Sequence, residues 1–122
     1  MSVEEIKALV RRWYEAWSKG KAATMAVIDE SYATDFVLHP GIGEDMRGLK
    51  DFKRSCSELF SAFPDYHMTF DDLIVEGDKV ASRWTMTGTH QGEFMGIPPT
   101  NKKWKGWAIA IRRIIDGKFV EE

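Results

Sequence analysis

The chain has 122 residues, an apolar fraction of 43% and a formal net charge of -2, which leaves room for a single domain, residues 1–122, around one core. The basic residues are scattered, which argues against nucleic acid as a partner, and no apolar run is long enough to cross a bilayer, which argues against a membrane. The one cysteine, Cys56, cannot form an internal disulfide, and the N-terminus lacks the layout of a signal peptide. These features indicate a cytoplasmic protein.

The N-terminal half carries three helical patterns. Ser2 and Glu5 form a capping box, after which apolar residues recur at three- and four-residue steps until the chain nears Gly20. A shorter helix is expected from Lys21 to about Glu30, and a third from Leu49 until Pro64 stops it. The segment from Tyr32 to His39, between the second and third helices, is typical of a short strand.

The C-terminal half is extended. Strands are expected at Tyr66 to Val75, Lys79 to Thr89, Lys103 to Ile115 and Lys118 to Glu122. The Gly77-Asp78 and Asp116-Gly117 pairs supply the hairpin turns that join them. Three helices followed by long strands predict an α+β cone, in which the helices pack in a curved antiparallel sheet that encloses one pocket.

Alternation along the second long strand places His90 on an apolar side that it shares with Trp84 and Met86. An imidazole there is a candidate general acid or base, because its unperturbed pKa of about 6.5 suits proton transfer at neutral pH. The alternative is a hydrogen-bonded structural residue, which is the commoner role of a lone histidine at a strand end.

The third long strand is apolar on both faces. Trp107, Ile109 and Ile111 lie on one face, while Ala110 and Arg112 lie on the other. We expect one face to line the cavity and the other to be covered by a second subunit, which predicts a homodimer through the sheet. Burial of both faces within one chain is the alternative.

Several kinds of chemistry lack residues to carry them. No His, Cys or carboxylate pair has metal-ligand spacing, so no metal site is expected. Asp71 and Asp72 are adjacent and therefore point to opposite faces of a strand. Cys56 shares a helix face with Phe52 and Phe60, which favours burial over nucleophilic catalysis.

Five motifs carry a family resemblance. They are Phe63-Pro64-Asp65, Gly77-Asp78-Lys79-Val80, Arg83-Trp84, the run from Gly88 to Thr100 (GTHQGEFMGIPPT) and Asp116-Gly117-Lys118. Together they resemble the SnoaL-like polyketide and ester cyclases of the NTF2-like superfamily. The resemblance implies a cone whose pocket binds a small hydrophobic molecule, often in a homodimer, with no metal or organic cofactor.

The sequence departs from the family pattern in the local motif that carries the family acid. Cyclases of this family close a ring by intramolecular aldol chemistry, in which a carboxylate on the last long strand takes a proton from an activated carbon. The carboxylate belongs to a Gly-x-Asp-x-x-Arg run, in which this chain has Ala108 for the glycine and Ala110 for the acid. His90 is then the best remaining proton-transfer residue and the predicted catalytic residue.

The predicted pocket takes side chains from helices and strands. The expected ligand-binding residues are Tyr14, Trp17, His39, Phe60, Phe63, Trp84, Met86, Phe94, Ala110 and Arg112. Core packing is the alternative role, above all for Phe60 and Phe63, and Arg112 either holds an anionic ligand group or lies near the rim.

Three functions are compatible with these residues. The first is a cofactor-independent cyclase, isomerase or hydrolase that acts on an apolar carbonyl or ester compound with His90. The second is a module that binds a small molecule without turnover, because the family acid is replaced by Ala110. The third is a dimerisation domain whose pocket is filled by its own large side chains.

Overall fold

The computed structural model describes residues 1–41 and 43–122 and contains the three predicted helices. They are α1 (Val3–Trp17), α2 (Lys21–Ser31) and α3 (Leu49–Ala62). The capping box of α1 is confirmed, since the Ser2 hydroxyl accepts from the Glu5 amide at 3.1 Å and the Glu5 carboxylate accepts from the Ser2 amide at 3.1 Å. Among the described residues, no helix is long and apolar enough to cross a membrane.

One six-stranded sheet carries the order β2-β1-β6-β5-β4-β3. Its strands are β1 (Tyr32–Leu38), β2 (Met46–Arg47), β3 (His67–Glu76), β4 (Lys79–Thr89), β5 (Lys103–Ile115) and β6 (Lys118–Glu121). The α+β cone is therefore confirmed, but the prediction of a wholly antiparallel sheet is wrong, because β1 pairs parallel to β6. The chain reaches β6 only after α3 and the long strands, so no turn sets its direction relative to β1.

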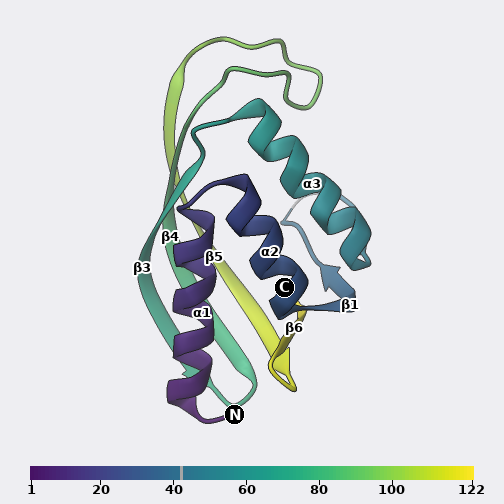
Figure 1. Cartoon of the computed structure of the whole chain (residues 1–122), viewed down its shortest axis with the longest axis vertical. Helices are drawn as coiled ribbons and strands as arrows, with labels where there is room; N and C mark the ends of the chain where they lie inside the picture. The colour runs from purple at the N-terminus through teal and green to yellow at the C-terminus, as the bar shows by residue number, and fades with distance from the viewer. Residues whose placement is uncertain (42) are drawn as a thin grey trace.

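The helices lie on one face of this curved sheet, with α1 packed along β3 and α3 packed against β1 (Figure 1). The three long strands β3, β4 and β5 pass behind α1, and the loop between β4 and β5 extends beyond them toward the end of α3 (Figure 1). The apolar faces of α1 and α3 are thus turned toward the inner face of the sheet.

Two contacts hold the β4–β5 loop to the end of α3. The amides of Gln91 and Gly92 both donate to the Ala62 carbonyl at 3.0 Å. The backbones approach so closely that a Cβ at position 92 would lie 2.3 Å from the Ser61 carbonyl oxygen, so only glycine fits.

A second anchor explains the Phe63-Pro64-Asp65 motif. The two Asp65 carboxylate oxygens accept from the amide and the hydroxyl of Thr89, each at 2.7 Å. These bonds lower the pKa of Asp65 and tie the residues after α3 to the end of β4.

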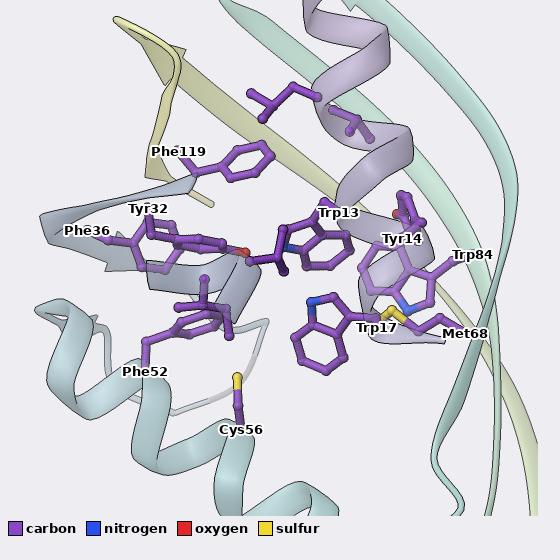
Figure 2. Close-up of a cluster of buried hydrophobic side chains, with 14 of the residues drawn as sticks. Trp13, Tyr14, Trp17, Tyr32, Phe36, Phe52, Cys56, Met68, Trp84 and Phe119 are labelled. Atoms are coloured by element: carbon purple, nitrogen blue, oxygen red, sulfur yellow. The ribbon is translucent and has the colours of Figure 1, made fainter. Parts of the chain in front are cut away.

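Aromatic rings fill most of the interior (Figure 2). Trp13 and Trp17 of α1 lie 5.2 Å apart between their ring centroids, and Tyr32 stacks on Phe52 at 5.0 Å. Packing of this kind removes large apolar areas from water and supplies most of the stabilisation of a small domain.

Arg112 is the exception in this apolar interior, because its side chain is only 1% exposed. Its Nε donates to the Glu122 carboxylate at 2.8 Å, and its Nη1 donates to the Ser82 hydroxyl at 3.0 Å. The guanidinium also lies 4.2 Å from the centroid of the Trp13 ring. Burial alone would disfavour the charge, but Glu122 keeps the pKa of Arg112 above its usual value.

His39 follows β1 and lies at the surface, with 45% of its side chain exposed. Its Nδ1 lies 3.0 Å from an Asp45 carboxylate oxygen, and its Nε2 lies 2.7 Å from a Glu121 carboxylate oxygen. Hydrogen bonds to Asp45 and then to Glu121 raise the pKa of His39. The His39 side chain therefore links the end of β1 to the neighbouring strand β6.

Breaking the Arg112 pair should destabilise the fold. Arg112→Met keeps the length of the side chain but leaves the Glu122 carboxylate, only 16% exposed, without its cation. We expect a loss of about 3 kcal/mol in the free energy of unfolding, measured by urea denaturation. Arg113→Met is the matched control, because the neighbouring side chain is exposed on the opposite face, and it should change stability by no more than about 0.5 kcal/mol. Equal losses of stability in the two variants would contradict a stabilising role of the Arg112–Glu122 ion pair.

His39 should make stability depend on pH. Its pKa in the folded state is raised above 6.5, so its stabilising effect is fully present below that pH and is lost as the pH rises through the folded-state value. The difference in melting temperature between the wild type and His39→Gln should therefore be largest at pH 6 and should shrink as the pH rises above it. His67→Gln, on the exposed first residue of β3, should retain the wild-type pH dependence. A constant difference across the range would show that His39 is not the titrating group.

Candidate functional site

His90 lies directly after β4, on the inner face of the sheet, and is 9% exposed. Its backbone is held on both sides, since its amide donates to the Lys102 carbonyl at 3.0 Å and its carbonyl accepts from the Asn101 amide at 2.8 Å. These bonds extend the β4–β5 pairing by one step and set the direction of the imidazole.

The His90 side chain has one anchored nitrogen and one without a partner. Nδ1 lies 3.1 Å from the Thr100 hydroxyl oxygen, which also accepts from the Lys102 amide at 3.4 Å. Nε2 is buried and has no hydrogen-bond partner among residues 1–41 and 43–122. A buried ring nitrogen that is left free while the other is held is an arrangement suited to proton transfer with a ligand.

Aromatic rings surround this histidine. Phe63, which ends α3, lies 5.5 Å from the imidazole, 5.2 Å from Phe94 and 5.3 Å from Trp104 between ring centroids. We call these four residues, His90, Phe63, Phe94 and Trp104, the His90 cluster. Its apolar walls would strengthen any hydrogen bond or charge that forms inside it.

The centre of the cone holds a different group. The Tyr14 hydroxyl donates to the Ser82 hydroxyl at 2.9 Å, and Ser82 also accepts from Arg112. Ala110 is paired with Ser82 in the sheet, so the position of the family acid faces this polar chain with only a methyl group. The anionic partner of Arg112 is the chain's own Glu122.

The remaining predicted residues pack in the core or lie at its margin. Trp17 and Phe60 stack with centroids 5.8 Å apart, and Trp84 lies 6.0 Å from Tyr14. Met86 is half-buried on the inner face of β4. His39 is the one that the structure separates from the others, because its two carboxylate contacts hold it at the surface.

A cavity of about 370 Å³ lies between α1 and β3. Tyr14, Met68 and Phe70 contribute its apolar surface, while Arg11 and His67 are among its polar lining residues. His90 does not line this cavity. The structure therefore divides the predicted residues between this cavity, the core and the His90 cluster, and one pocket shared by all of them stays a prediction.

The cysteine and the grouping of metal-binding side chains also bear on the chemistry. Burial raises the pKa of the Cys56 thiol to about 12, which leaves little thiolate to act as a nucleophile. Within residues 1–41 and 43–122, no three His, Cys, Asp or Glu side chains are grouped as a metal site would require.

Sequence reasoning missed four residues of this site. Thr100 lies inside the long family motif but ten residues from His90, and Trp104 shares the inner face of β5 with Ala110. Ser82 shares the inner face of β4 with Trp84, so alternation could have found it. Glu122 meets Arg112 only through the sheet pairing, which no local pattern reports.

Comparisons with known proteins identify the family of this chain. The model of the SnoaL-like polyketide cyclase family matches residues 7–122. Aklanonic acid methyl ester cyclase DauD of Streptomyces sp. (strain C5) is 31% identical over 119 residues, covering 91% of this chain and 69% of DauD. The corresponding cyclase DnrD of Streptomyces peucetius is 32% identical over 115 residues, covering 91% of this chain and 77% of DnrD.

A solved structure shows the same fold. AclR from Streptomyces galilaeus superposes with a TM-score of 0.85 at 32% sequence identity, covering 98% of this chain and 86% of AclR. The family motifs, the matched residues and this superposition lead to one assignment: the chain belongs to the SnoaL-like polyketide cyclase family and has its NTF2-like cone fold.

Proposed function

We propose that this protein is a cofactor-independent acid–base enzyme that closes a ring in a small apolar ester, with His90 as the proton-transfer residue. The observation that carries the proposal is the buried, unpartnered Nε2 of His90 inside an aromatic cluster. The relatives named as aklanonic acid methyl ester cyclases supply the class of compound to test.

The hydrogen bond to Thr100 gives His90 its part in the reaction. When Nδ1 carries the ring proton and donates it to the Thr100 hydroxyl, Nε2 keeps a free lone pair and acts as a base. In an intramolecular aldol closure, Nε2 takes a proton from a carbon flanked by carbonyl groups, and that carbon attacks a ketone carbon of the same molecule. The new alkoxide then takes the proton back from the imidazolium, so substrate and product are isomers.

Access to Nε2 depends on the β4–β5 loop. Phe94 lies on this loop outside the paired strands and is half-buried, whereas Phe63 is 7% exposed. Displacing Phe94 therefore costs less packing than moving a core ring. A flat ligand that takes its place would lie against Phe63 and reach the imidazole.

Binding without turnover is the second candidate, and Ala110 is the observation that favours it. The methyl group replaces the family acid opposite Ser82, and the cation nearby is already paired with Glu122. If His90 cannot supply the missing base, the protein would bind the same class of molecule and release it unchanged.

We also propose that a second copy of the chain covers the outer face of the sheet. Trp107, Ile109 and Ile111 alternate along β5 and are 68%, 59% and 64% exposed, and Ile74 of β3 is 65% exposed. A twofold axis through Ile109 would bring Trp107 of one copy beside Ile111 of the other, as a self-complementary interface requires. Exposed apolar rows of this kind favour association over solvation.

The function proposal predicts the effect of removing the histidine. His90→Gln retains a hydrogen-bonding side chain that cannot transfer a proton, so it should slow conversion of aklanonic acid methyl ester by roughly 10²- to 10⁴-fold. Conversion is followed by chromatography of substrate and product. Glu58→Gln, on the exposed face of α3, should leave the rate unchanged.

The same assay separates the two candidate functions. Binding of the ester by wild type without any product would support binding without turnover. Turnover by His90→Gln at the wild-type rate would contradict the role of the histidine, even if the protein is an enzyme. Thr100→Val removes the partner of Nδ1 and should slow conversion roughly tenfold without weakening binding.

The dimer proposal predicts the effect of one charge on the outer face. Wild type should elute at twice the mass of the chain in size-exclusion chromatography with light scattering, and Ile109→Lys should elute as a monomer. Val3→Lys places the same charge on another exposed apolar residue, in α1, and should leave the dimer intact. A wild-type monomer at every concentration tested would overturn this proposal.

A further inference from the structure

Trp104 is the member of the His90 cluster whose polar group has no role in the fold. Its indole nitrogen is buried and has no hydrogen-bond partner within residues 1–41 and 43–122. An indole nitrogen can only donate, so a buried one without an acceptor is unfavourable unless something else supplies that acceptor. We propose that the Trp104 N–H binds a carbonyl oxygen of the ligand, beside His90.

The neighbouring strand places no side chain against this nitrogen. Trp104 is paired with Gly88 of β4, and a Cβ at position 88 would lie 3.4 Å from the Trp104 Nε1 and 3.3 Å from the Phe63 Cβ. Any larger residue at position 88 would therefore press on the edge of the indole that carries the N–H. Glycine at position 88 avoids this contact.

Trp104 and His90 border the same ring. They are diagonal neighbours on the inner face of β4 and β5, because Trp104 pairs with Gly88 and His90 lies two residues further along β4. The Phe63 ring lies 5.3 Å from Trp104 and 5.5 Å from His90. A flat molecule lying along Phe63 would thus meet an N–H donor from one residue and a free ring nitrogen from the other.

The indole nitrogens of Trp13, Trp17 and Trp84 are also buried without a partner among the described residues, so the position of Trp104 is what distinguishes it. Trp13 lies under the Arg112 guanidinium, and Trp17 stacks between Trp13 and Phe60. Trp84 packs beside Tyr14 and, with Trp13 and Trp17, belongs to the central aromatic cluster (Figure 2). These three are enclosed by the protein's own rings, whereas Trp104 lies beside Gly88 at the end of the sheet next to His90.

The donor selects the chemical class of the ligand. A ketone, quinone or ester oxygen can accept from the indole, whereas a hydrocarbon ring of the same shape cannot. This inference rests on the proposed function, because it assumes that a ligand occupies the His90 cluster. During proton abstraction by His90 the electron pair of the C–H bond moves onto the carbonyl oxygen, and the Trp104 N–H would stabilise that oxygen as it becomes an enolate.

Two matched probes test the inference, anthraquinone-2-sulfonate and anthracene-2-sulfonate, which differ in two carbonyl groups. The five tryptophans give separate indole N–H signals in a ¹H–¹⁵N spectrum of labelled protein, and Trp104→Phe identifies its own by removing it. The quinone should shift the Trp104 signal downfield, and the hydrocarbon should not. Trp104→Phe should weaken binding of the quinone roughly tenfold and leave the affinity for the hydrocarbon unchanged.

Matched variants guard against a loss of structure. Trp107→Phe makes the same change on the outer face of the same strand and should bind both probes as wild type does. Gly88→Ala retains the indole but places a methyl group against its nitrogen, so it should weaken quinone binding as Trp104→Phe does.

The outcomes separate this inference from the proposed function. Quinone binding without a selective Trp104 shift, or with the same affinity in Trp104→Phe, overturns the donor role and leaves the role of His90 intact. Binding of neither probe overturns both the donor role and the ligand site. A full Trp104 effect together with unchanged turnover in His90→Gln supports the donor and contradicts the acid–base function.

Discussion

The buried charge of Arg112 is the constraint on which the interior of this cone depends. A guanidinium that is 1% exposed is stable only where its charge and its N–H groups are matched. The chain meets this need with pieces from distant segments: Trp13 of α1 provides an aromatic face, Ser82 of β4 a hydroxyl and Glu122 a carboxylate. The position of α1 on the sheet and the pairing of the C-terminal segment with β1 are thus coupled through one side chain.

The Arg112–Glu122 ion pair also bears on position 110, where the family pattern predicts an acid. Position 110 lies on the same face of β5 as Arg112 and two residues before it, so an aspartate there would compete with Glu122 for the guanidinium. With alanine at that position the ion pair is undisturbed, and the hydrogen bonds that join Tyr14, Ser82 and Arg112 continue to the Glu122 carboxylate. The polar groups at the centre of the cone are therefore bonded to one another, whereas the buried Nε2 of His90 has no partner within residues 1–41 and 43–122.

Patterns between residues close in sequence predicted the features that depend on neighbouring residues, namely the faces of the strands and the start of the first helix. Alternation placed His90, Trp84 and Met86 on one side of β4, and the capping box set the start of α1. The parallel pairing of β1 with β6 joins segments separated by most of the chain, so no local pattern could predict it. Strand β2 has only two residues, which is too short to show an alternating pattern of apolar residues. His39 ends its strand as expected, but the carboxylates that hold it at the surface come from a loop and from β6, so its sequence position could not show its role.

The long motif from Gly88 to Thr100 has a physical meaning that is independent of the acid. Gly88 leaves room for Phe63 and Trp104, Gly92 lets the loop meet the end of α3, and Thr100 holds the imidazole of His90. All three residues position the aromatic rings or the histidine of the His90 cluster, whereas the expected position of the family acid, Ala110, lies on β5. The residues of the motif therefore preserve the architecture around His90 whatever residue stands at position 110. Family membership here specifies the fold, and we expect the residues that differ from the family pattern to decide the chemistry.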